Sequence, residues 1–206
     1  MKIFNINFFI KFFIFLSIFY LYGCTPPPPK NVDNICSIFS EYKNWYWITK
    51  CSERQWGVPI SVQMAIIHQE SKFNGKAQPL RTKLLWVIPW KRPSTAYGYS
   101  QALQTTWDHY LLSLGLTRRR SDFASASDFI GWYSNQAYKK ANIKKDNAYQ
   151  LYLAYHEGIG GYLKKTYLKK PWLIAVAHKV SARSQKYQSQ LNTCEKKFKK
   201  KWWHLI

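Results

Sequence analysis

Apolar residues recur at spacings of three and four along most of the chain, which is the pattern of helices with one buried face. Pro171 opens the longest such segment, whose buried stripe is expected to comprise Leu173, Val176, Val180, Ser184, Tyr187, Leu191 and Cys194. A second segment runs from Pro59 to about Phe73, and its apolar positions include Ile60, Met64 and Ile67. Further helices are expected over residues 34–42, 44–56, 101–114, 125–140 and 146–157.

Short polar residues and glycine mark the ends of two of these helices. Ser125 or Ser127 is expected to cap the helix over 125–140, because a serine hydroxyl can accept from free backbone N–H groups. Asp146 is expected to cap the following helix, which Gly158 should end. Glu157 would then be a solvated helix end.

Residues 74–95 interrupt the helical pattern. The segment contains Pro79, Pro89 and Pro93 together with the β-like run TKLLWVI. It is expected to be a long loop or a small β hairpin, and a loop of that length in a compact domain is usually functional. The chain therefore reads as mainly α, with a single folded domain over 34–195.

The first residues have a different composition. An uncharged, predominantly apolar run over 12–22 follows Lys11. As a helix it would be about 16 Å long, too short to cross a hydrocarbon core of about 30 Å. A secretory signal peptide over 1–23 fits better.

The signal segment ends in LYGC, which resembles the lipobox of bacterial lipoproteins, where cleavage precedes a cysteine that is then acylated. Cys24 is the expected lipidation site, and ordinary cleavage or an uncleaved anchor are the alternatives. Residues 24–33, with four prolines, are expected to form a lipidated spacer, and 196–206 a basic aromatic tail. The residue directly after Cys24 is Thr25, whereas an Asp at this position would resemble an inner-membrane retention signal. The periplasmic face of the outer membrane is therefore expected, with the inner membrane as the alternative.

Export to an oxidising compartment also bears on the remaining cysteines. Cys36, Cys51 and Cys194 would give one disulfide and one free thiol. Because the ends of a domain often lie close together, the pair Cys36–Cys194 is favoured. Cys51 is the alternative partner for either, and three buried thiols are a further alternative. The cysteines and histidines show no zinc-site spacing, and no metal or cofactor is expected.

The charge predicts anionic partners. The chain has 31 Lys and Arg against 10 Asp and Glu, a formal charge of +21. Nucleic acid, acidic lipid and anionic polymers would all be attracted, but export disfavours nucleic acid. The lysine doublets at 164–165 and 169–170 and the basic tail would attract a polymer or a membrane surface. The sequence does not fix an oligomeric state.

One of these few acidic residues ends an apolar run. Glu70 follows Ile66 by four residues and Ile67 by three, so on a helix it lies beside the apolar stripe. A carboxyl group held there is desolvated, which favours its neutral form and lets it donate a proton, as the general acids of glycosidases do. The alternative is a helix end that points into water.

Three short segments, HQESKF, AYGYSQ and LAYHEG, occur in this order over roughly 56–162. Together they resemble the catalytic domain of lytic transglycosylases of the soluble-lytic-transglycosylase type, which has a lysozyme-like fold. That family carries a Glu-Ser pair, a Gly-x-x-Gln segment and an Ala-Tyr-Asn segment. Glu70-Ser71, Gly98 to Gln101 and Ala154-Tyr155 match them, and His156 stands where Asn is usual.

The resemblance implies a membrane-anchored enzyme that cleaves the β-1,4 bond between N-acetylmuramic acid and N-acetylglucosamine in peptidoglycan, leaving 1,6-anhydro ends. Glu70 would be its catalytic acid and then its base. Substrate binding would fall to Ser71, Gly98, Tyr99, Ser100, Gln101, Tyr155 and His156. Gly98 would let the backbone approach the glycan, and Tyr155 would hydrogen-bond Glu70 or the sugar. A hydrolytic muramidase using Asp108, Asp122 or Asp128, and a non-catalytic peptidoglycan-binding lipoprotein, are the alternatives.

Overall fold

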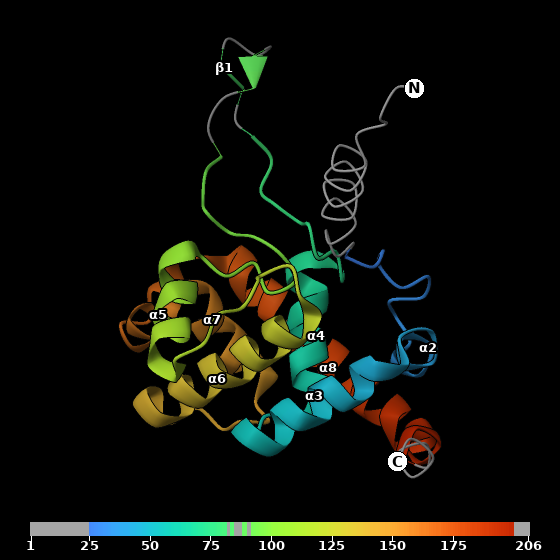
Figure 1. Ribbon diagram of the computed structural model, residues 1–206. Coiled ribbons are helices and arrows are strands. Elements are labelled where there is room, and N and C mark those ends of the chain that lie inside the picture. Colours follow the sequence, from blue (N-terminus) through green and yellow to red (C-terminus); the bar gives the residue numbers. More distant parts are fainter. Residues whose placement is uncertain (1–24, 82, 85–87, 90–91, 200–206) are drawn as a thin grey trace, which may run out of the picture.

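The computed structural model describes residues 25–81, 83–84, 88–89 and 92–199. The expected signal peptide, Cys24 and residues 200–206 of the expected tail lie outside this range. The described residues form seven α-helices, one 3-10 helix and one pair of short strands (Figure 1). Their bounds are α2 Ile35–Glu41, α3 Lys43–Trp56, α4 Ile60–Ser71, β1 Lys83–Leu84, β2 Ile88–Pro89, α5 Gln104–Leu114, α6 Phe123–Ala141, α7 Ala148–Leu163, η2 Thr166–Lys169 and α8 Pro171–Lys199. The prediction of a mainly α fold is confirmed.

Helix α4 lies at the centre of the helical body (Figure 1), in contact with α3, α6, α7 and α8. The spacing in the sequence predicts a one-sided apolar stripe, but residues Ile60 to His68 are buried without interruption. A helix that is largely apolar around its circumference is typical of a core position. The helix ends at Ser71, and the next two residues, Lys72 and Phe73, both have a positive φ, of 49° and 63°. The chain turns there, and the Phe73 ring is buried in the core beside Trp45.

Two helix caps differ from the prediction. The side chain of Asp122 caps α6 by accepting from the backbone N–H of Ser125 at 2.8 Å, so neither expected serine is the cap. Asn147 caps α7 by accepting from the N–H of Gln150 at 3.0 Å, in place of Asp146. Both corrections move the cap to a residue whose side chain reaches the free N–H groups of the first turn.

The segment between α4 and α5 contains the predicted hairpin. Strands β1 and β2 pair antiparallel, with Lys83 opposite Pro89 and Leu84 opposite Ile88. The hairpin extends away from the helical body (Figure 1). The returning chain closes a bridge between Tyr97 and Ala102 immediately before α5.

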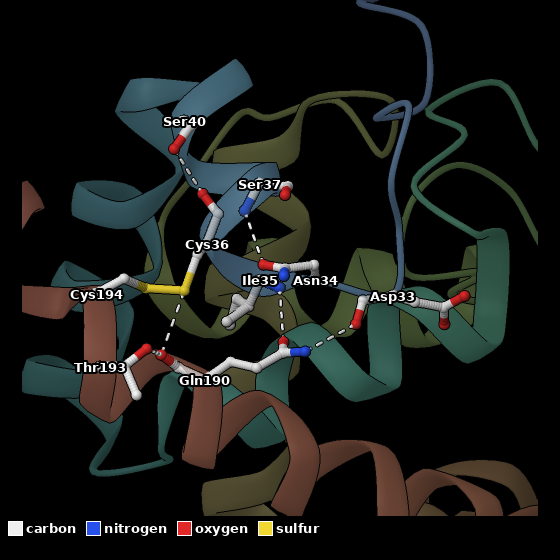
Figure 2. The surroundings of a disulfide bond; sticks show 9 residues. All are labelled: Asp33, Asn34, Ile35, Cys36, Ser37, Ser40, Gln190, Thr193 and Cys194. Carbon is white, nitrogen blue, oxygen red and sulfur yellow. Dashed lines mark hydrogen bonds between the residues drawn. A yellow bond between two sulfur atoms is a disulfide. The ribbon is translucent and has the colours of Figure 1, made fainter.

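The two ends of the folded domain are joined covalently, as predicted. Cys36 and Cys194 form a disulfide with a Cα–Cα distance of 6.1 Å. Figure 2 shows Gln190 beside it: its amide oxygen accepts from the backbone N–H of Ile35 at 3.0 Å, and its amide nitrogen donates to the carbonyl of Asp33 at 3.2 Å. Cys51 is a free, exposed cysteine.

The described part of the proline segment follows the surface of the domain. Its contacts include a hydrogen bond of 2.7 Å from the Tyr42 hydroxyl to the Pro27 carbonyl and a bond from the Tyr187 hydroxyl to the carbonyl of Val32. Residues 27–32 are therefore docked and do not form a free spacer. At the other end, α8 continues to Lys199, beyond the expected domain boundary at 195. None of the helices in the described ranges is long and apolar enough to cross a membrane.

Candidate active site

Glu70 opens onto a cavity between four helices. The cavity has a volume of about 380 Å³. The loop before α5 and helices α4 to α7 line it through Glu70, Ala96, Gln101, Ala102, Leu103, Thr106, Phe129, Tyr133, Tyr155, His156, Glu157 and Gly158. Of the eight residues that the resemblance implies for catalysis and substrate binding, four therefore line the cavity: Glu70, Gln101, Tyr155 and His156.

The carboxyl group of Glu70 sits among apolar and aromatic neighbours at the end of α4. Burial raises its pKa to about 7, whereas a hydrogen bond from Tyr152 acts in the opposite direction. At neutral pH the group is thus present in both protonation states. The desolvation expected from its position beside the apolar stripe is the dominant cause of the raised pKa.

Tyr152 did not stand out in the sequence. Its side chain is 4% exposed, and its own pKa is raised by burial and by the Glu70 carboxyl. Tyr152 lies three residues before Tyr155 on α7, so both occupy the same helix face. That spacing is the signal from which the residue could have been found.

Ser71 and Tyr99 are buried and are not among the residues that line the cavity. The Ser71 hydroxyl is 2.8 Å from the carbonyl oxygen of Tyr99, to which it donates. The ring of Tyr99 is fully buried, edge-on to Trp45 and Phe123. The hydrogen bond from Ser71 therefore fixes the Gly98–Gln101 loop against the end of α4.

Gly98 is required by packing within the protein. Its φ is +78°, and a Cβ there would lie 2.1 Å from the carbonyl oxygen of Arg120. The close approach is therefore to Arg120, and the expectation that this glycine admits the glycan is not supported by its position. Gln101, which does line the cavity, donates from its amide nitrogen to the carbonyls of Ala77 and Gly98 at 2.9 and 2.8 Å. Its amide oxygen makes no hydrogen bond within the described residues, so it is available as an acceptor.

Tyr155 supports the same loop. Its hydroxyl donates to the carbonyl of Ser100 at 2.6 Å, and Ser100 itself is fully buried and outside the cavity lining. The ring packs edge-on against Tyr133 and Phe129. Of the two partners expected for Tyr155, Glu70 or the sugar, Glu70 instead accepts a hydrogen bond from Tyr152.

Glu157 is a paired carboxylate, and the expectation of a solvated helix end is wrong. Its side chain is 4% exposed and accepts from Lys170 at 2.7 Å, Thr166 at 2.5 Å and the Nδ1 atom of His156 at 3.1 Å. The hydrogen bond from Lys170 is the main reason that the Glu157 pKa falls to about 2. The backbone of Gly158 is non-helical, with φ of 75° and ψ of 154°, so the helical stretch that begins at Ala148 is interrupted at this glycine as predicted, and a second stretch follows to Leu163.

The three aspartates considered for a hydrolytic mechanism lie outside the cavity lining. Asp108 accepts from Gln104, and Asp122 caps α6. Asp128 accepts from Trp56 at 2.7 Å, Tyr110 at 2.6 Å and Arg118 at 2.8 Å. Across the described residues, no three His, Cys, Asp or Glu side chains are close enough together to hold a metal ion.

Comparison with protein families places this geometry in a wider context. Residues 12–194 match the family described as Transglycosylase SLT domain. No curated protein matches the sequence. Since the family match covers most of the 206 residues, the chain belongs to the transglycosylase SLT domain family, whose members act on peptidoglycan.

Proposed function

We propose that this protein is a lytic transglycosylase that uses Glu70 to cleave the β-1,4 bond between N-acetylmuramic acid and N-acetylglucosamine. The observation that carries the proposal is a carboxyl group with a pKa of about 7 on the wall of the cavity. Such a group can donate a proton and later accept one at the same pH. The family match supports the same reaction class.

The reaction needs only this one group for its proton transfers. Glu70 gives its proton to the glycosidic oxygen, the bond from that oxygen to C1 of the muramic unit breaks, and N-acetylglucosamine leaves with a free 4-hydroxyl. The Glu70 carboxylate then takes the proton of the muramic C6 hydroxyl, while the C6 oxygen forms a bond to C1. The product is a 1,6-anhydro ring, no water is consumed, and Glu70 regains its proton. The substrate's acetamido group would stabilise the positive charge that develops at C1 between the two steps.

Neighbouring residues would hold the reacting groups in position. Tyr152 orients the Glu70 carboxyl through its hydrogen bond. Gln101 offers an amide oxygen as an acceptor for a sugar hydroxyl or acetamido N–H. Tyr155 contributes part of the cavity wall and fixes the loop that carries Gln101 through the Ser100 carbonyl.

A hydrolytic mechanism is less well supported by the cavity. Such an enzyme ordinarily needs a second carboxylate to activate water. Apart from Glu70, Glu157 is the acidic side chain among the described residues that line the cavity. Both of its oxygens already accept hydrogen bonds, and its low pKa makes it a weak base.

A digestion of purified peptidoglycan tests the proposal. The wild-type protein should release anhydro-muropeptides, each lighter than the hydrolysed product by one water. Glu70→Gln should release none while keeping the wild-type circular dichroism spectrum. Reducing ends without anhydro products would support the muramidase instead, and undiminished digestion by Glu70→Gln would refute the role of Glu70. Binding without digestion by the wild type would support a non-catalytic peptidoglycan-binding protein.

We further propose that the protein is exported and anchored to a membrane through lipid on Cys24. The support is the sequence LYGC after an apolar run, followed by the proline segment. The outer membrane is the proposed location, and the basic tail would add attraction to anionic head groups. Labelled fatty acid should be incorporated into the wild type and not into Cys24→Ala. Equal labelling of both would exclude this residue as the anchor.

A further inference from the structure

An exposed basic and apolar surface adjoins the cavity where α7 leads into α8. Lys164, Lys165 and Lys169 are exposed there, and Leu168 and Trp172 are 60% and 56% exposed. We call these five residues the η2 patch. Large apolar side chains exposed among charges are typical of a binding surface.

Two contacts fix the η2 patch to the cavity wall. Lys170 and Thr166, which lie within the same segment, both donate to the Glu157 carboxylate. The Trp172 ring meets the ring of His156 edge-on, with centroids 5.1 Å apart. Glu157 and His156 both line the cavity. The η2 patch is therefore continuous with the rim of the candidate active site.

The chemistry of the η2 patch fits the anionic polymer that the cavity would cleave. A flat aromatic ring presents an apolar face to the C–H face of a pyranose ring, as Trp does at many amphipathic interfaces. The stem peptides of peptidoglycan carry free carboxylates, which lysine side chains attract over a Debye length of about 8–10 Å. Of the four lysines near this corner, Lys170 is already paired with Glu157, which leaves the three exposed ones for a ligand.

We propose that the η2 patch is a second binding site for the peptidoglycan strand, in which Trp172 stacks on a sugar and the three lysines contact the carboxylates of a stem peptide. The proposal rests on the function proposed above. It assigns the enzyme a preference for glycan that carries peptides over bare glycan. A basic surface with exposed Trp and Leu also suits an anionic membrane, but its continuity with the cavity favours the strand.

Digestion of two substrates tests this site: intact peptidoglycan and glycan strands stripped of their peptides by an amidase. The triple variant Lys164→Gln, Lys165→Gln, Lys169→Gln should lower kcat/KM on intact peptidoglycan roughly five- to tenfold and leave the stripped glycan almost unchanged. Lys139, Lys140 and Lys144 are also exposed and lie at the end of α6 and in the loop after it. Changing these three lysines to Gln removes the same charge and should leave kcat/KM unchanged on both substrates. Trp172→Ala should lower kcat/KM on both substrates, because both contain the sugar rings.

The proposal is overturned if the η2-patch triple variant affects both substrates equally or behaves like its control. It is also overturned if that variant keeps the substrate preference but loses binding to phosphatidylglycerol vesicles, because the surface would then face a membrane. If the wild type forms no anhydro product from either substrate, the proposed function fails. The site is then tested by co-sedimentation of the same variants with intact and stripped peptidoglycan, where the intact material should bind the wild type more strongly.

Discussion

The hydroxyl of Tyr155 donates to the carbonyl oxygen of Ser100 at 2.6 Å, and this bond ties α7 to the loop that carries Gln101. One helical turn earlier, Tyr152 donates to the Glu70 carboxyl. Two tyrosines on the same face of α7 thus serve different partners. One sets the environment of the catalytic group, and the other holds the neighbouring wall of the cavity.

Replacing the two tyrosines should separate these roles. Tyr152→Phe removes a donor that stabilises the ionised carboxyl, so the pKa of Glu70 should rise further, by roughly one unit. The alkaline limb of kcat/KM should move to higher pH by the same amount. Tyr155→Phe should lower activity without moving that limb, because its hydroxyl bonds Ser100 and not Glu70. A pH profile of peptidoglycan digestion from pH 5 to 9 measures both effects, and identical profiles for the two variants would contradict the assignment.

The raised pKa of Glu70 predicts a stability effect that depends on pH. The carboxyl has a pKa of about 7 in the folded protein against 4.5 for its ordinary value. Below pH 4.5 the raised pKa therefore does not lower the free energy of unfolding. The destabilisation grows as the pH rises from 4.5 to 7 and is constant at higher pH. Since the Glu70 side chain borders the cavity and keeps some exposure to solvent, we expect Glu70→Gln to be more stable than the wild type by roughly 1–2 kcal/mol at pH 8. Denaturant unfolding at pH 8 and pH 4.5 checks this, and an equal difference at both pH values would contradict it.

Glu157 should show the opposite dependence. Its pKa of about 2 lies below the ordinary value of 4.5, so its ionised form stabilises the fold above pH 4.5, and this contribution is lost as the pH falls toward 2. Glu157→Gln should therefore lower the free energy of unfolding by roughly 1 kcal/mol at pH 7. The effect is modest because the Lys170 side chain is 41% exposed. The cost should be smaller at pH 3. Unfolding curves at both pH values test this, and a larger loss at pH 3 would refute the pairing.

The disulfide should contribute strongly to stability because it closes most of the domain. Cys36 and Cys194 are 158 residues apart, and a loop of this size removes about 4–5 kcal/mol of chain entropy from the unfolded state. Cys36→Ser should lower the free energy of unfolding by roughly 2–5 kcal/mol. Cys51→Ser, which changes an exposed free thiol, is the matched control and should change it little. Similar unfolding midpoints for the two variants would argue against the bond.

Local patterns in the sequence predict the helices well, because helix formation depends on spacings of three and four residues. The position of Glu70 beside an apolar stripe could be read in the same way, since Ile66 and Ile67 are its near neighbours on α4. The disulfide followed from a general property of domain ends and not from any local signal.

The features that the sequence did not predict depend on segments brought together by folding. Glu157 is paired with Lys170, which lies 13 residues later and beyond the break at Gly158, and no spacing rule contains a contact across such a break. Tyr152 became significant only once α7 lay beside the end of α4. The contact of Gly98 with Arg120 has the same origin, because Arg120 comes from the segment after α5.

Gly98 offers a last test, in which a matched glycine separates backbone strain from packing. Gly98 and Gly115 both have positive φ, of 78° and 63°, but a Cβ at Gly115 would meet no atom within 4 Å. Gly115→Ala should therefore cost only the conformational strain, roughly 1 kcal/mol. Gly98→Ala adds a clash at 2.1 Å with the Arg120 carbonyl, which a backbone shift must relieve. We expect Gly98→Ala to lower the free energy of unfolding by at least about 2 kcal/mol more than Gly115→Ala does. It should also displace Gln101 and reduce activity, which Gly115→Ala should not do. Equal unfolding free energies for the two variants would show that the loop accommodates the Cβ, and that Gly98 is not fixed by its contact with Arg120.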